Sequence, residues 1–572
     1  MRTQTLRPLL TTARRFGRRV AVGASWAVAA IGWSGLILVG VLAVAAFLRF
    51  KGVSWGLPYS YQDPDEKVVL LRAFRIARGH LNPEFFFYPS LLFNLIGTAI
   101  WGVSKFYVPH SGITLISPVT FVTDPTPYYL IGRSVVATCG VVSVYLMYRL
   151  GKEAFSRPVG LVAALFLAVE PLHVRYSHVA VTDVPATMFG LLALLLFLRA
   201  ARLRSPRTLL FGALAAGLAT GTKYNLGMLV VPGVIACWYV YRGQPAAHRV
   251  RALAARATRR IAAPMLLAFV VSTPYAVLDP RHFLGDFVSQ NKIVANGWLG
   301  FENVHNGYWY NLSVNLLASL GIVLLALGLI GIVLALVRHT RADLILVPYV
   351  IVYYLYVSSW HALMDRYLLP IVPLLIVLAV RACLAPVARP AVRRRAIVVA
   401  VATAVLLGAI VLPARASINY SRSLSGTDVR TVAKVWIERH LKPGTVIAME
   451  PYGPPLVPYF DLRFYAEASL TTPSYTIYKL PLPLPGASDP RARLRALVAH
   501  HVTYVVLSSQ VDSRVMAARA TYPLQILFYQ ELTRFGRNVA TFTPRPGEQG
   551  PTITVYRLPA SLTLAALNRA LS

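Results

Sequence analysis

The chain has 572 residues, of which 56% are hydrophobic and only 14% are charged, and its mean hydropathy is +0.56. Ordinary soluble proteins carry about 25% charged residues, which disfavours a soluble enzyme of several domains. Lys and Arg outnumber Asp and Glu by 57 to 22, but the arginines form short clusters between long apolar runs. This pattern argues against a nucleic-acid partner and is typical of a polytopic membrane protein.

The first apolar run, from about Val20 to Phe47, follows an arginine-rich N-terminus. It is longer than the apolar part of a cleaved signal peptide and reaches the ~20 residues that span a bilayer. We expect a first transmembrane helix with its basic end in the cytoplasm. Ten further spans are expected at 131–150, 159–172, 184–200, 207–222, 226–241, 261–278, 314–337, 343–359, 367–388 and 396–412.

Charge assigns the loops to two sides. If the spans alternate, the arginine clusters share one side, which the positive-inside rule identifies as the cytoplasm. Of the 13 acidic residues before residue 413, only Glu153 and Asp343 then lie on that side. Counting the apolar run 89–108 as a span would reverse every later cluster, so we expect an interfacial or re-entrant helix there, within a long outer loop at 49–130. The sequence thus predicts about eleven spans in the plasma membrane, with the N-terminus inside and the C-terminus outside.

The composition changes after residue 412. The last 160 residues contain 9 of the 22 acidic residues, and helix-like and strand-like segments alternate, beginning with a helix at 428–441 and a strand at 445–449. Such alternation predicts a small α/β domain. We therefore expect a transmembrane module at 1–412 and an extracytoplasmic α/β accessory domain at 413–572.

Ionisable groups at the outer membrane face are candidates for chemistry, because charge is costly near lipid. Asp63, Asp65 and Glu66 place three carboxylates within four residues directly after the first helix. Such neighbours raise one another's pKa, so they need a role or a cation, unless they form a solvated loop. In the next outer loop, Asp183 either caps the following helix or takes part in function, and the two roles are compatible.

Three segments resemble motifs of bacterial family 39 glycosyltransferases, GT-C membrane enzymes related to protein O-mannosyltransferases and aminoarabinose transferases. LPYSYQDPDEKVVLLRAFRIARGHLNPEFFFYPSLLFNL (57–95) is similar to their first outer loop, with its Asp-Glu pair at Asp65-Glu66 and its Tyr-Pro at Tyr88-Pro89. PLHVRYSHVAVTDVPATMF (171–189) resembles their second acidic motif, and DRYLLPIVPLL (365–375) resembles their late Arg-Tyr-x-x-Pro motif. The resemblance extends over essentially the whole chain.

The departures limit what carries over. The chain has no Trp-Trp-Asp motif, which counts against an oligosaccharyltransferase subunit. Aminoarabinose transferases carry an arginine three positions after the first Asp of the pair, where this chain has Val68. The identity of the acceptor is therefore not inferred from either relative.

The resemblance implies transfer of one sugar from a polyprenyl-phosphate lipid to an acceptor hydroxyl on the outer face, with inversion. Asp65 is the expected catalytic base, which removes the proton of the acceptor, and Asp63 is the rival base. Glu66 is expected to orient the loop or the acceptor. Asp183 is expected to position the sugar, the base or a bound cation.

The leaving phosphate develops charge, for which arginine and lysine are natural donors. Arg133 and Arg366 are the first choices, because both lie at outer helix ends beside the motifs, and we expect them to face one lipid-accessible groove. The remaining substrate-binding candidates are Asp63, Arg72, Arg75, Tyr88, His173, Arg175, Lys223, His361 and Tyr367. The alternative for each cation is a side chain that reaches the lipid headgroups, and the alternative for each histidine is a structural role.

Two other classes of protein remain open. A transporter or flippase would show internal repeats and charges within its spans, and a non-catalytic scaffold would leave the outer carboxylates dispensable. The three cysteines lie far apart in apolar runs and lack the spacing of metal ligands, so no cofactor is certain, although a divalent cation at the carboxylates stays open. The expected partners are a polyprenyl-phosphate-linked sugar, membrane lipid and an acceptor that is a protein, a lipid or a glycan.

Overall fold

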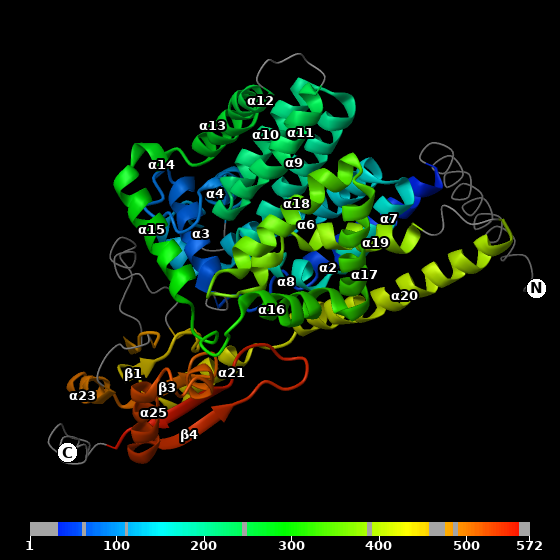
Figure 1. Cartoon of the computed structure of the whole chain (residues 1–572). Helices are drawn as coiled ribbons and strands as arrows, with labels where there is room; N and C mark the ends of the chain where they lie inside the picture. The colour runs from blue at the N-terminus through cyan, green and yellow to red at the C-terminus, as the bar shows by residue number, and fades with distance from the viewer. Residues whose placement is uncertain are drawn as a thin grey trace, which may run out of the picture.

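A computed structural model describes residues 32–59, 64–108, 112–242, 249–385, 392–456, 475–483 and 490–559 of the chain. The structure comprises a helical body at 33–423 and a small domain with a mixed sheet that lies against one end of this body (Figure 1). The predicted class, a polytopic helical membrane protein with a C-terminal α/β domain, is confirmed. Helix α20 (Val392–Ser423) runs through the expected boundary at residue 413.

Seven helical segments among the described residues are long and apolar enough to cross a membrane. They are α2 (Trp33–Phe50), α6 (Thr126–Ala154), α9 (Asp183–Leu203), η1 with α11 (Tyr224–Leu229 and Val230–Tyr241), α16 to α17 (Gly307–Tyr310, η3 Asn311–Leu316 and Leu317–Arg338), α18 (Arg341–Ser358) and α20. Each of the eleven expected spans overlaps a helix, although the first of them begins outside the described residues. Four expected spans contain shorter helices, namely α7 (Arg157–Ala168), α10 (Pro206–Thr220), α13 (Ala263–Ser272) and α19 (Val372–Leu384).

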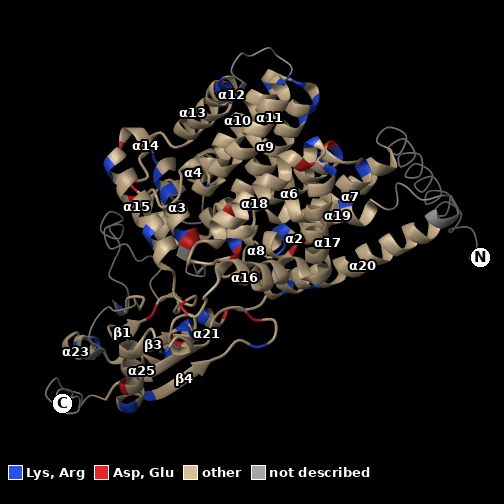
Figure 2. Cartoon of the chain, in the orientation of Figure 1, with Lys and Arg blue, Asp and Glu red and all other residues tan. Residues whose placement is uncertain are grey.

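Small residues let the helices of the body approach closely, as is usual between membrane helices. A Cβ atom on Gly160 of α7 would lie 2.4 Å from the carbonyl oxygen of Tyr148 in α6, so only glycine permits this contact. At the end of the body that carries α7 and α12 (Arg249–Ala257, continued by η2, Thr258–Ala262), Lys and Arg gather (Figure 2). There Asp343 closes the capping box of α18 and pairs with Arg381, both in the protein interior.

The segment between α2 and α6 forms α3 (Pro64–Ala77), α4 (Leu91–Val103) and α5 (Pro118–Thr123). Helix α4 lies within the apolar run 89–108 and has 13 residues. At 1.5 Å per residue it is about 20 Å long, too short to cross the ~30 Å core of a bilayer by itself. It packs on α3 so closely that a Cβ on Gly97 would lie 2.7 Å from the carbonyl oxygen of Ala73.

Three short elements and one longer helix complete the opposite end of the body. The short elements are α8 (Pro171–Tyr176), α14 (Tyr275–Leu278) and η4 (Asp365–Leu368), and the longer helix is α15 (Pro280–Asn296). Proline begins both α8 and α15, where its missing N–H costs no hydrogen bond.

The C-terminal domain contains a five-stranded sheet in the order β2-β1-β3-β5-β4. Strand β1 is parallel to β2 and β3, while β5 is antiparallel to β3 and β4. Side chains of β3 alternate between two apolar clusters, Val505 and Leu507 on one face and Val506 on the other, so both faces are covered. The strands are β1 (Val446–Met449), β2 (Thr476–Lys479), β3 (Tyr504–Ser508), β4 (Arg537–Phe542) and β5 (Ile553–Arg557), and the helices are α21 (Val429–His440), α23 (Pro490–Ala499), α24 (Asp512–Ala517) and α25 (Pro523–Phe535).

The C-terminal domain contacts the segment that follows α15. Leu299 is buried in the apolar cluster beneath α24 and α25. The Tyr522 hydroxyl donates to Glu302 Oε1 at 2.6 Å, and Asn303 Nδ2 donates to the carbonyl oxygen of Ala517 at 3.0 Å. The C-terminal domain therefore packs on, and hydrogen-bonds to, the segment that follows α15.

Replacing Glu450 by Gln is expected to reduce the loss of stability that the C-terminal domain shows as pH rises. Burial raises the pKa of the Glu450 carboxyl to about 8, although Tyr529 and the Ser508 N–H donate to it. Between the unfolded pKa of about 4.3 and the folded value, the unfolded chain has released a proton that the folded domain retains. Stability therefore falls with rising pH, by up to ~1.4 kcal/mol per pH unit. Thermal melts of the full chain at pH 5 and pH 8 would contradict this if wild type and variant changed equally.

Candidate active site

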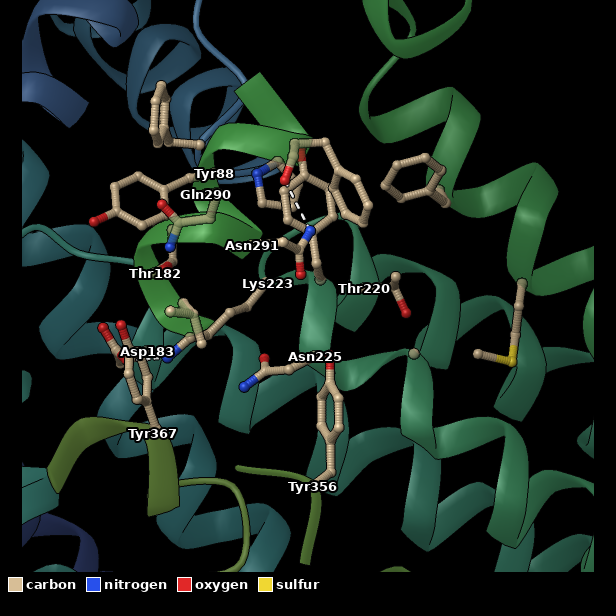
Figure 3. Close-up of a pocket in the computed structure, with 18 of the residues that line it drawn as sticks. Tyr88, Thr182, Asp183, Thr220, Lys223, Asn225, Gln290, Asn291, Tyr356 and Tyr367 are labelled. Carbon is tan, nitrogen blue, oxygen red and sulfur yellow. Dashed lines mark hydrogen bonds and ion pairs between the residues drawn. The ribbon is translucent and has the colours of Figure 1, made fainter. Parts of the chain in front are cut away.

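A cavity of about 470 Å³ lies where α9 begins, α10 ends and α15 passes across the body. Its polar part includes Asp183, Lys223 and Tyr367, which lie together in Figure 3, with Thr182 and Tyr88 on the same side. The apolar wall comprises Val230, Met265, Leu266, Phe269, Phe283 and Phe287. Leu266 of α13 is 61% exposed, so this wall borders the outer surface of the helical body. The cavity thus joins a charged end to an apolar flank.

The first charged pair of the site, Asp65 and Arg366, joins α3 to η4, which lie far apart in the sequence. Arg366, in η4, lines the cavity and donates from Nη1 to Asp65 Oδ2 at 2.6 Å. Asp65 lies in the first turn of α3, where the helix dipole favours a carboxylate. The side chains of Asp65 and Arg366 are 31% and 18% exposed. This pair is therefore reachable by solvent and by a ligand in the cavity.

The second charged pair is drier. Lys223 Nζ lies 2.5 Å from Asp183 Oδ1, and the two side chains are 11% and 3% exposed. Asp183 is the first residue of α9, and Lys223 follows α10. The Lys223 ammonium also lies 4.8 Å from the centre of the Tyr367 ring. The cavity therefore has a cation from each of two separate elements at its polar end.

Glu66 and Arg133 form a third pair, which lies in the protein interior. Arg133 donates from Nε and Nη2 to the two Glu66 oxygens at 2.7 and 2.8 Å, and from Nη1 to the carbonyl oxygens of Val53 and Trp55. The Ala180 N–H donates to Glu66 as well. Contrary to the expectation of a shared groove, Arg133 is 0% exposed, and of the two arginines only Arg366 lines the cavity.

A glycine lies beside this interior pair. A Cβ on Gly132 would lie 2.6 Å from the Leu70 side chain and 3.2 Å from Ala180, so a larger residue would force the Leu70 side chain to move. The pair thus ties α3, the segment after α2 and the segment before α9 together. Because Asp65 precedes Glu66 in α3, the pair also holds the backbone of Asp65 beside Arg366, which lines the cavity.

A further polar group was not singled out from the sequence. Asp365 accepts from Arg175 and, at 2.9 Å, from the Tyr176 hydroxyl. Asp365 and Arg366 are neighbours in sequence whose side chains bind different partners, Arg175 and Asp65 respectively. An acid directly before the arginine of the late motif was the available signal. Arg175 does not line the cavity, and its side chain is 42% exposed.

The other predicted residues are placed as follows. Tyr88 lines the cavity, where burial, and then the nearby Asp65, raise the pKa of its phenol, so that it stays a hydrogen-bond donor. Arg72 stacks over the Phe85 ring at 4.8 Å, and Arg75 pairs with Glu84 at 3.1 Å.

Neither predicted histidine lines the cavity, although His361 borders it through Val294. His173 is fully buried, with Nδ1 3.0 Å from Arg49 Nη2. His361 is exposed, and its backbone N–H donates to the carbonyl oxygen of Val294 at 3.1 Å. Asp63 lies outside the described residues.

Sequence reasoning missed one wall of the cavity. Gln290 and Asn291 of α15 point into it (Figure 3), and Phe283 and Phe287 of the same helix also line it. Asn225, between Lys223 and α11, also lines the cavity and donates to the Tyr353 hydroxyl at 2.7 Å. Within the described ranges, no group of three His, Cys, Asp or Glu side chains is arranged to hold a metal ion.

Comparisons with known proteins agree with this architecture. Residues 130–278, which include Arg133, Asp183 and Lys223, match the family model of dolichyl-phosphate-mannose-protein mannosyltransferases. No curated protein matches the chain in sequence.

Solved structures share the fold at low identity. The Archaeoglobus fulgidus oligosaccharyltransferase AglB, in complex with an inhibitory peptide and a dolichol-phosphate, has a TM-score of 0.52 at 14% identity, over 93% of this chain and 75% of AglB. ArnT from Cupriavidus metallidurans bound to undecaprenyl phosphate has a TM-score of 0.51 at 15% identity, over 93% of this chain and 99% of ArnT. The chain is therefore a polytopic membrane protein that shares the GT-C fold of AglB and ArnT, and its residues 130–278 match the mannosyltransferase family model.

Proposed function

We propose that this protein transfers a single sugar from a polyprenyl-phosphate donor to an acceptor hydroxyl at the outer face of the membrane, with inversion. The observation that carries the proposal is a single cavity with two cation–carboxylate pairs at one end and an apolar wall that reaches the surface of the helical body. A lipid phosphate has the same two parts, an anionic head and an apolar chain. AglB and ArnT, which share the fold, bind dolichol-phosphate and undecaprenyl phosphate.

The geometry supports the following roles. Arg366 and Lys223 donate to the phosphate as it leaves and gains charge. The polyprenyl chain extends along Val230, Met265 and Leu266 toward lipid. Asp65 takes the proton of the acceptor hydroxyl while the oxygen attacks the anomeric carbon of the sugar. The bond between the anomeric carbon and the phosphate oxygen breaks on the opposite face, and the lipid phosphate leaves. This single displacement inverts the configuration at the anomeric carbon.

Arg366→Ala is expected to weaken use of the donor by about 1.5–3 kcal/mol, the value of a charged hydrogen bond. The full chain in nanodiscs is given undecaprenyl-phosphate-linked sugars together with an extract of cell membranes as the acceptor source. Mass spectrometry follows the release of undecaprenyl phosphate. The control is Arg202→Ala, which breaks an arginine–carboxylate pair with Glu153 at the far end of the body and should keep wild-type release.

Two results would contradict the proposal. The first is movement of intact donor across a bilayer without cleavage, which would identify a flippase. The second is equal release of undecaprenyl phosphate by wild type and Arg366→Ala, which would show that the donor phosphate does not bind Arg366 in the cavity.

A further inference from the structure

Both cations at the polar end of the cavity are already paired with carboxylates. Arg366 is bound to Asp65 at 2.6 Å and Lys223 to Asp183 at 2.5 Å. A phosphate that enters the cavity meets no uncommitted charge on either side chain. It has to displace a carboxylate or share the donor with one.

The two pairs differ in how readily they open. The side chains of Asp183 and Lys223 are only 3% and 11% exposed, so water reaches this pair less easily. Asp65 is 31% exposed, which gives water and ligand access to its carboxylate. Its neighbour Glu66 is fixed by Arg133, so the backbone of α3 stays in place while the Asp65 side chain turns. The Asp65–Arg366 pair is therefore the one that can exchange partners.

We propose that Asp65 and the phosphate compete for Arg366, so that arrival of the donor releases Asp65 to act as the base. The role of Asp65 as the base rests on the proposed function, whereas the competition itself does not. The Asp65 Oδ2 atom accepts from Arg366, so this oxygen is occupied until Arg366 turns to the phosphate. It can then accept the hydrogen of an acceptor hydroxyl, and this happens only with a donor in the cavity. The exchange thus couples activation of the base to occupancy of the donor site.

The test measures binding without transfer. The full chain in nanodiscs of neutral phosphatidylcholine is titrated with undecaprenyl phosphate, and native mass spectrometry gives the dissociation constant. Asp65→Asn removes the competing charge and is expected to tighten binding roughly tenfold. Asp365→Asn removes the same charge one residue from Arg366, but its partner is Arg175, which lies outside the cavity. This control is expected to change the affinity by less than about twofold.

A double variant assigns the effect to Arg366. Arg366→Ala should weaken binding, and adding Asp65→Asn to it should change nothing further, because no donor remains to be released. Unchanged or weaker binding by Asp65→Asn would overturn the competition, since Arg366 would then hold both anions. Equal tightening in Asp365→Asn, or tightening in the double variant, would also overturn it, because the effect would be general electrostatics.

Failure of the competition and failure of the proposed function are distinguishable. If wild type cleaves no donor while Asp65→Asn still binds undecaprenyl phosphate more tightly, the function is wrong and the competition holds. If wild type cleaves donor while the affinities are equal, the reverse is true. Thermal melting of each variant confirms that it is folded before its binding is compared.

Discussion

Replacing Asp65 by Asn is expected to lower the rate of sugar transfer by roughly 10²–10⁴-fold, the usual contribution of a general base. Asn keeps the shape of the side chain at the start of α3, so the fold should be preserved. It cannot accept the acceptor's proton, so the chemical step is slowed. If the competition for Arg366 also holds, the loss appears in kcat, while the KM for the donor does not rise. Initial rates measured over a range of donor concentrations separate the two constants.

The control for this prediction is the neighbouring acid Asp63, which lies outside the described residues. Asp63→Asn should retain most of the activity, because Asp65 is the carboxylate that the structure places against a residue of the cavity. An inactive Asp63→Asn with a nearly wild-type Asp65→Asn would make Asp63 the base. Full activity in both variants would remove the main support for an enzyme that uses a carboxylate base.

The fold was largely predictable because membrane spans follow from apolar runs. The lengths of the helices were predicted less well, since hydropathy does not register local breaks. The expected span 261–278 contains α13, which ends at Ser272 just before Pro274, and a residue before proline is disfavoured in a helix. The expected span 367–388 begins inside η4, and α19 begins only at Val372, within a stretch that contains Pro370 and Pro373.

The C-terminal domain shows the same limit. The helix at 428–441 and the strand at 445–449 correspond to α21 and β1, but β2 was not predicted. Strand β2 has four residues, lies at the edge of the sheet and is followed by a proline-rich segment. Neither alternation nor length distinguishes such a strand from a loop.

The candidate site was predictable in its members and less so in its pairings. The motifs pointed to Asp65, Asp183, Tyr88 and Arg366, and the structure brings all four to one region. No sequence pattern pairs Asp65 with Arg366, which are 301 residues apart. Arg133 shows the converse problem. A cation at a helix end has the same sequence signature whether it binds a phosphate or a buried carboxylate, and only packing decides between the two.

Breaking the Glu66–Arg133 pair is expected to destabilise the protein by about 3–5 kcal/mol, as is typical when one partner of a buried pair is removed. Glu66→Ala leaves the Arg133 guanidinium in the interior with only two carbonyl oxygens, and it also removes the acceptor for the Ala180 N–H. The thermal midpoint of the full chain in detergent should fall by roughly 5 °C or more.

The matched control is the surface pair Arg75–Glu84, whose side chains are 29% and 56% exposed. Glu84→Ala should cost less than about 1 kcal/mol, because water replaces the lost contact. Arg133→Ala should behave like Glu66→Ala, since it leaves the Glu66 carboxylate buried without its cation. If Arg133→Ala instead melted like wild type and lost binding of undecaprenyl phosphate, Arg133 would be a ligand of the phosphate rather than the residue that holds α3 and Asp65 in place.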